Sequence, residues 1–92
     1  MTAPYDLELS GPAVRAIREE LPEAVAAAII EFLTGGLREN PRRVGHPLHH
    51  DLEGLWSARR GTFRVIYEID EEDRLIRVLR VDHRRDAYRP LR

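Results

Sequence analysis

The segment WSARRGTFRVIYEI, residues 56–69, limits the possible folds of this chain more than any other part of it. Its aromatic and β-branched residues predict two β-strands joined by a tight turn at Gly61–Thr62. In a two-residue turn, Arg59 lies directly opposite Arg64. Like charges that face each other destabilise a strand pair, so the position of these two arginines needs a reason.

The two faces of the predicted hairpin differ in character. Trp56 and Tyr67 form a cross-strand aromatic pair on the face expected to contact the helices. Arg59 and Arg64 fall on the other, helix-free face, where an anion bound between them explains their position. The alternative is a solvated basic face whose charges spread apart or pair with acids such as Glu68.

The rest of the chain predicts the element order β-α-α-β-β-β. Residues 5–9 alternate as a strand, Ser10 caps a first helix, and a second helix runs from Pro22 to a glycine stop at residues 35 and 36. Three strands follow a polar connection, over residues 54–60, 62–69 and 74–83. This order predicts an α+β fold in which a helical hairpin packs on one face of a small antiparallel sheet, followed by a short C-terminal tail.

Length and composition exclude several classes of protein. Residues 1–92 make a single domain. The absence of cysteine excludes disulfides, thiolate zinc sites and cysteine nucleophiles. No apolar run approaches the roughly 18 residues of a membrane span, and the N-terminus lacks the pattern of a signal peptide. We therefore expect a cytoplasmic protein with no membrane partner.

Charge is distributed unevenly along the chain, although the net charge is only −1. Residues 1–41 carry three arginines and seven acids, whereas residues 42–92 carry twelve arginines and nine acids. All fifteen basic residues are arginine, which either reflects genome composition or serves phosphate binding through the planar guanidinium fork.

A second basic cluster, VDHRRDAYR, ends the last predicted strand. His83 is a residue type suited to proton transfer near neutral pH. Tyr88 can donate or accept a hydrogen bond, or stack on a base. The structural alternative is a histidine that caps the strand and a tyrosine that covers the edge of the core.

The segment HPLHH raises the question of a metal site. His46, His49 and His50 lie close together in sequence, but the segment is a predicted loop with Pro47 in it, and only Asp51 adjoins it. Metal ligands are usually placed by regular structure with further carboxylate or cysteine companions. We expect histidines on a solvated loop, or near bound RNA, and no metal or other cofactor.

With these residues described, the chain resembles the RelE/ParE superfamily of bacterial toxins, specifically its RelE-like branch. The motifs PLHHDLEGLWSARRGTFRVIYEID and VLRVDHRRDAYR carry the resemblance, which extends over nearly the whole chain. It implies a metal-independent endoribonuclease that enters the ribosomal A site and cuts messenger RNA by attack of the 2′-hydroxyl on the adjacent phosphate. It also implies a cognate, RelB-like antitoxin that wraps the toxin in a hetero-oligomer.

The resemblance assigns roles residue by residue. Arg64 corresponds to the sheet arginine that contacts the scissile phosphate, and Arg84 corresponds to a second phosphate-binding arginine. Tyr88 corresponds to an aromatic residue that orients or stacks on the RNA, and His83 is the preferred acid or base. The expected catalytic set is Arg64, His83, Arg84 and Tyr88. The expected RNA- and phosphate-binding set is Ser57, Arg59, Arg60, Arg85 and Arg89.

One departure from the family pattern leaves alternatives open. RelE-type enzymes carry two lysines on the strand before the turn, whereas this chain has Leu55 and Ser57 there, so the proton-transfer roles stay undecided. Arg59, on the same face, is expected to compensate. The main alternative is a ParE-like inhibitor that has the same fold and binds DNA gyrase without nuclease activity. A non-toxic basic binding domain is a third possibility.

Overall fold

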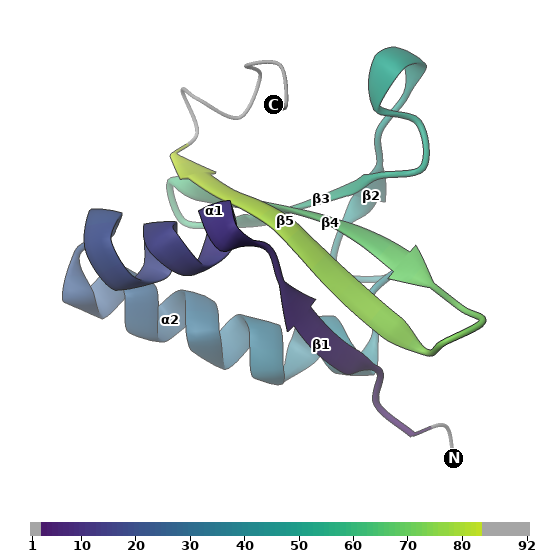
Figure 1. The fold of residues 1–92 in the computed structure, drawn as a ribbon, viewed down its shortest axis with the longest axis horizontal. Coiled ribbons are helices and arrows are strands. Elements are labelled where there is room, and N and C mark those ends of the chain that lie inside the picture. The colour runs from purple at the N-terminus through teal and green to yellow at the C-terminus, as the bar shows by residue number, and fades with distance from the viewer. Residues whose placement is uncertain (1–2, 84–92) are drawn as a thin grey trace.

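The arginine hairpin lies within a five-stranded sheet in the computed structural model of the chain, which describes residues 3–83 (Figure 1). The strands are β1 (Asp6–Leu9), β2 (His46–Pro47), β3 (Trp56–Arg60), β4 (Phe63–Asp70) and β5 (Leu75–His83). Their order across the sheet is β1-β5-β4-β3-β2. All neighbours pair antiparallel except β1, which is parallel to β5. The predicted α+β fold is confirmed, with a mixed sheet and an additional short edge strand, β2.

The first helix is anchored to the sheet at its start. α1 (Gly11–Arg15) begins after Ser10, whose Oγ accepts a hydrogen bond from the Ala13 N–H (3.2 Å). The same hydroxyl donates to the Leu79 carbonyl of β5 (2.6 Å). The helix continues as the π-helical turn η1 (Ala16–Glu20) and then stops, because the proline at position 22 restricts the residue before it.

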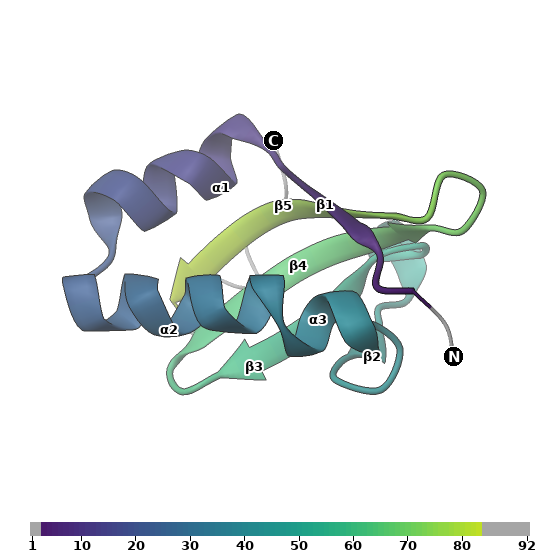
Figure 2. The same ribbon diagram turned by 90° about the horizontal axis from the view of Figure 1, so that it is seen from below.

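The second helix covers the sheet and closes the core. α2 (Glu23–Thr34) runs antiparallel to α1 on the same face of the sheet (Figure 2), and it buries Ile29 and Leu33. Gly35 interrupts the helix as predicted, but one further turn, α3 (Gly36–Glu39), follows it. The sheet contributes to this core through its helix-side residues Ala58, Val65, Tyr67, Ile76, Val78 and Val81.

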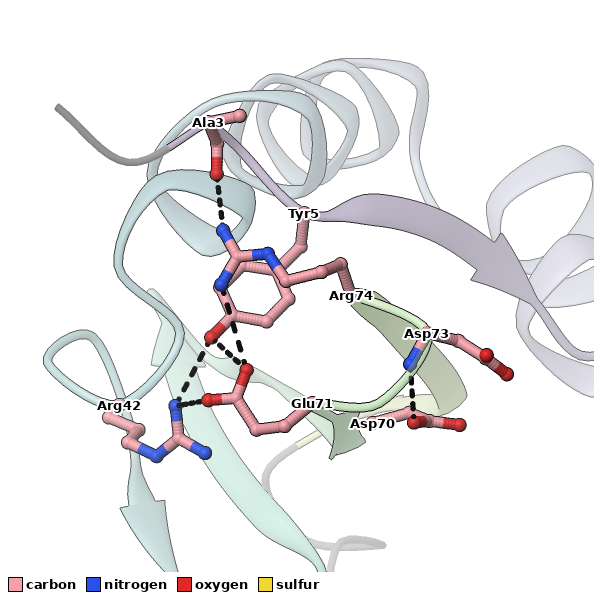
Figure 3. A network of polar contacts seen from close by, with 7 residues as sticks. All are labelled: Ala3, Tyr5, Arg42, Asp70, Glu71, Asp73 and Arg74. Atoms are coloured by element: carbon pink, nitrogen blue, oxygen red, sulfur yellow. Dashed lines mark hydrogen bonds and ion pairs between the residues drawn. The ribbon is translucent and has the colours of Figure 1, made fainter.

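A polar network ties the N-terminal segment to the β4–β5 turn (Figure 3). The Tyr5 hydroxyl donates a hydrogen bond to Glu71 (2.6 Å) and accepts one from Arg42 (3.2 Å). Arg42 and Glu71 also form an ion pair at 2.8 Å. The Arg74 guanidinium lies 3.9 Å from the centre of the Tyr5 ring and donates to the Ala3 carbonyl. The acidic turn therefore holds three separate parts of the chain together.

Candidate functional site

The face of the sheet opposite the helices carries a group of polar and charged side chains beside the β3–β4 hairpin, which we call the outer face. Side chains alternate between the two faces of a strand, so the register determines which residues share a face. Arg59 pairs with Arg64, and Ser57 pairs with Ile66, which confirms the predicted register. Gly61 adopts φ +60°, the left-handed conformation that a two-residue hairpin turn requires. Beside the hairpin, the outer face consists of Ser57, Arg59, Arg64, Ile66, Arg80 and Asp82.

A β-bulge in β5 determines which side chains complete the outer face. The β4 partners of Val78 and Arg80 are adjacent in sequence, so Leu79 is an extra residue at this step. Without the extra residue, strict alternation would place Arg80 on the helix side together with Val78. The bulge therefore turns Arg80 and Asp82 toward the outer face. Sequence reasoning missed Arg80 because simple alternation assigns it to the wrong face.

Beside the hairpin, arginines outnumber carboxylates among the described residues of the outer face. Arg59 is exposed, whereas only 9% of Arg64 is exposed, and a guanidinium keeps its charge when partly buried. Arg80 forms an ion pair with Asp82, with 2.7 Å between Nε and Oδ2. Asp82 also pairs in register with Arg64. Among the described residues beside the hairpin, one carboxylate thus accompanies three guanidinium groups, a residue set of the kind that binds anions.

Ser57 adds a hydroxyl at the centre of this face. Its residue is 1% exposed, and its Oγ makes no hydrogen bond to any residue within the described range 3–83. A buried hydroxyl without a partner is costly, so this group favours a ligand or a water molecule that supplies one. The sequence-based assignment of Ser57 to a phosphate-binding set is consistent with this position.

Farther from the hairpin, the same face of the sheet carries more carboxylates than arginines around Arg77. Arg77 contacts three carboxylates, with distances of 3.1 Å to Glu68, 3.0 Å to Asp70 and 3.8 Å to Glu8. The hydrogen bond to Glu68, followed by that to Asp70, raises the pKa of Arg77 above its usual value. Glu68, which the sequence offered as a partner for the hairpin arginines, pairs with Arg77 instead. An anion is attracted to the hairpin end of the face and not to this end.

Arg60 does not belong to the outer face. It pairs with Phe63 on the helix side, and its guanidinium lies 4.2 Å from the centre of the Phe32 ring of α2. This cation–π contact borders an open depression of about 380 Å³, which is lined by Ala28, Glu31, Phe32, Gly35, Gly36 and Arg60. The structure thus separates Arg60 from Arg59 and Arg64, although the three are close in sequence.

The second predicted cluster is only partly described. His83 ends β5, and its backbone pairs with Phe63, a helix-side position of β4. The register position opposite Arg64 on the outer face belongs to Asp82, so the backbone register does not bring His83 together with Arg59 and Arg64 as the sequence predicted. Four further predicted site residues lie outside the described residues: Arg84, Arg85, Tyr88 and Arg89. Their predicted roles stay predictions.

The described part of the chain contains neither a metal-site arrangement nor a membrane-spanning helix. Within residues 3–83, no group of three or more His, Cys, Asp or Glu side chains is arranged to hold a metal ion. Among the helices of this same range, none has the length and apolar character needed to cross a bilayer. The outer face is therefore the strongest candidate site within these residues.

The chain is similar in sequence and structure to toxins of type II toxin–antitoxin systems. Residues 8–88 match the family model described as the ParE toxin of the type II toxin–antitoxin system, parDE. The chain is 46% identical over 86 residues to the toxin RelG of Mycobacterium tuberculosis, covering 94% of this chain and 98% of RelG. It is 44% identical over 86 residues to the toxin RelE of the same organism, covering 94% and 88%. The crystal structure of the M. tuberculosis toxin–antitoxin complex RelBE2 contains a chain that matches with a TM-score of 0.85 and 45% identity, covering 89% of this chain and 100% of that one.

Proposed function

This chain belongs to the RelE/ParE family of toxins from type II toxin–antitoxin systems, and on that premise we propose that it is an endoribonuclease that cuts messenger RNA on the ribosome. The observation that carries the proposal is the face-to-face register of Arg59 and Arg64 on the outer face. A phosphate between the two guanidinium groups replaces their repulsion with charge-assisted hydrogen bonds.

RNA supplies its own nucleophile, the 2′-hydroxyl next to the scissile phosphate. The enzyme must align this hydroxyl, accept its proton, stabilise the added negative charge and protonate the leaving 5′ oxygen. We assign Arg59 and Arg64 to the phosphate, where a single well-placed donor is worth about 100-fold or more in rate. The product is a 2′,3′-cyclic phosphate or the 3′-phosphate derived from it, and the arginines supply the stabilising charge without a metal ion.

The proton-transfer part of the proposal rests on C-terminal residues. We propose His83 as the acid or base, a role that typically contributes about 100- to 10,000-fold. Arg84 is proposed as a further phosphate contact, and Tyr88 is proposed to orient a base or assist proton transfer. For all three residues the support is the family resemblance of the motif VDHRRDAYR.

The proposed partners follow from the membership of the chain in the RelE/ParE toxin family. The similar M. tuberculosis chain was crystallised in a toxin–antitoxin complex, which supports a cognate RelB-like antitoxin and a hetero-oligomer for this chain. We propose that the antitoxin covers the outer face in the cytoplasm. The ribosomal A site positions the message, and such positioning supplies several kcal/mol to a small catalytic set.

Mapping of cleaved transcripts in a translating extract tests the proposal. The purified chain is expected to cut messages only when they are bound to ribosomes. The description of the matching family model as a ParE toxin supports one rival, inhibition of DNA gyrase. A gyrase inhibitor would leave transcripts intact and block supercoiling in a purified gyrase assay, so the two assays together separate the candidates.

A further inference from the structure

We propose that His46 is an additional RNA contact on the outer face, and that it contributes positive charge only while its imidazole is protonated. The inference rests on the proposed function, because it adds a pH-dependent part to the same RNA-binding surface. His46 is the first residue of β2 and pairs in register with Ser57 of β3. Directly paired residues project toward the same face of a sheet, so His46 shares the face of Ser57, at an exposed edge.

The segment before β2 is packed in a way that fixes where His46 lies. The Tyr67 hydroxyl donates a hydrogen bond to the Pro41 carbonyl (2.5 Å). A Cβ atom at Gly45 would lie 2.3 Å from that hydroxyl and 2.7 Å from the Ser57 carbonyl, so only glycine fits there. β2 is therefore an edge strand built against β3 and β4, and it holds His46 beside the outer face.

The distance from His46 to the arginine pair suits a single RNA strand. Neighbouring strands lie about 4.8 Å apart and each residue advances about 3.3 Å. In register, His46 is one strand and two residues from Arg59, which gives about 8 Å between their Cα atoms. Arg64 is two strands and two residues away, or about 12 Å. At these separations, the side chains of His46, Arg59 and Arg64 can reach the same phosphate or successive phosphates of one RNA strand.

The charged groups around His46 favour an anion as its partner. In the described sheet, β3 is the strand next to β2, and it presents Ser57 and Arg59 to the outer face. Glu68 and Asp70, the β4 carboxylates on this side of the sheet, lie two strands away and both pair with Arg77. An imidazolium offers two N–H donors to a phosphate and a neutral imidazole only one, so the protonated form of a histidine is the better phosphate ligand and its protonation is coupled to RNA binding.

This coupling predicts a direction for the pH dependence. Histidine changes charge between pH 5 and 8, and its protonated form offers two N–H donors to phosphate. RNA affinity gained through His46 is therefore present at the acidic end of this range and is lost as pH rises. A histidine that acted as general base would show the opposite trend, since it must be neutral to accept a proton.

The test is the salt dependence of binding to a single-stranded 2′-O-methyl RNA oligonucleotide, which lacks the attacking hydroxyl and so cannot be cut. Each phosphate contact adds about 0.7 to the slope of log affinity against log salt for a single strand. Slopes are measured at about pH 5.5 and about pH 8, on either side of the histidine range, for the full chain and three variants. The variants are His46→Gln, the fixed cation His46→Lys, and the matched loop control His49→Gln.

We expect the His46→Gln slope to be smaller than that of the unmodified chain by about 0.7 at the acidic pH, and equal to it at the alkaline pH. His46→Lys should keep the larger slope at both values, and His49→Gln should follow the unmodified chain. Equal slopes for His46→Gln and the unmodified chain at both pH values would overturn the assignment of His46. If the unmodified chain cuts ribosome-bound message nonetheless, the proposed function stands and only this inference fails. If it neither binds the oligonucleotide nor cuts message, both fail.

Discussion

Arg59 and Arg64 face each other directly across the β3–β4 hairpin, and Asp82 lies opposite Arg64 on the next strand. The single carboxylate is shared with Arg80, with which it forms an ion pair. Among the described residues, Asp82 is therefore the carboxylate that accompanies Arg64 and Arg80 on this face. Two arginines held face to face in this register offer donors on both sides of a bound phosphate.

The first prediction compares two neighbouring arginines on opposite faces. Arg59→Ala should weaken binding of single-stranded RNA and lower the salt slope by about 0.7, because one phosphate contact is lost. Arg60→Ala should leave RNA binding unchanged, since the Arg60 guanidinium packs over Phe32 on the helix side. It should instead lower the free energy of unfolding by about 0.5–1 kcal/mol, the usual worth of an exposed cation–π contact. Equal losses of RNA affinity in both variants would contradict the assignment of faces.

The second prediction concerns the glycine that allows β2 to approach β3. Gly45→Ala should destabilise the chain by about 1–3 kcal/mol, because its new methyl group meets the Tyr67 hydroxyl and the Ser57 carbonyl. Gly36→Ala is the matched control, since its nearest contacts would be at an ordinary 3.9 Å. Urea denaturation of both variants measures the difference. A Gly45→Ala protein as stable as the control would show that β2 does not pack as described.

The third prediction concerns acid stability through the network of Figure 3. The hydrogen bond from Tyr5, and then the pairing with Arg42, hold the pKa of Glu71 below its usual value. A carboxyl group with a lowered folded-state pKa stabilises the fold above its unfolded pKa, and this contribution is lost as pH falls through the lowered value. Glu71→Gln should therefore be less stable than the unmodified chain near neutral pH and lose less stability on acidification.

Urea denaturation at about pH 7 and about pH 3, on either side of the carboxyl range, measures this effect. Glu72→Gln, in the same turn, is the matched control. If the two glutamine variants respond to acid in the same way, the network does not contribute through Glu71.

The fourth prediction concerns alkaline stability. Burial raises the pKa of Tyr67 to about 12. A proton held more tightly in the folded state stabilises the fold below the ordinary tyrosine pKa, and the contribution is lost as pH rises from about 10 to about 12. Tyr67→Phe removes the hydrogen bond to Pro41 and should cost about 1 kcal/mol at neutral pH. It should also lose less stability than the unmodified chain across that alkaline range, and a parallel decline of both proteins would argue against this role of Tyr67.

The hairpin register was predictable because local chemistry determines it. Gly61 is suited to the left-handed turn conformation, and a two-residue turn leaves only one pairing for Arg59 and Arg64. The capped start of the first helix at Ser10 and its end before Pro22 follow from equally local rules. The sequence also predicted which face of the hairpin lies away from the helices, because the apolar residues of the hairpin fall on the opposite face.

The remaining features depend on non-local packing, which no sequence window contains. The bulge at Leu79 inverts the alternation of β5 and turns Arg80 to the outer face. The parallel pairing of β1 with β5 has no local signal, because either direction buries the same apolar residues. β2 was expected to be loop, and it forms only because Gly45 can approach the Ser57 carbonyl. The placement of His46 is a consequence of that approach.

The rate of cleavage of ribosome-bound messenger RNA by Arg64→Ala tests the central claim most directly, with the surface variant Arg18→Ala as control. Because Arg64 is largely buried, thermal melting establishes first that the variant is folded. We predict a loss of about 100-fold or more for Arg64→Ala and none for Arg18→Ala. A folded Arg64→Ala protein that cuts ribosome-bound message at the full rate would contradict the account.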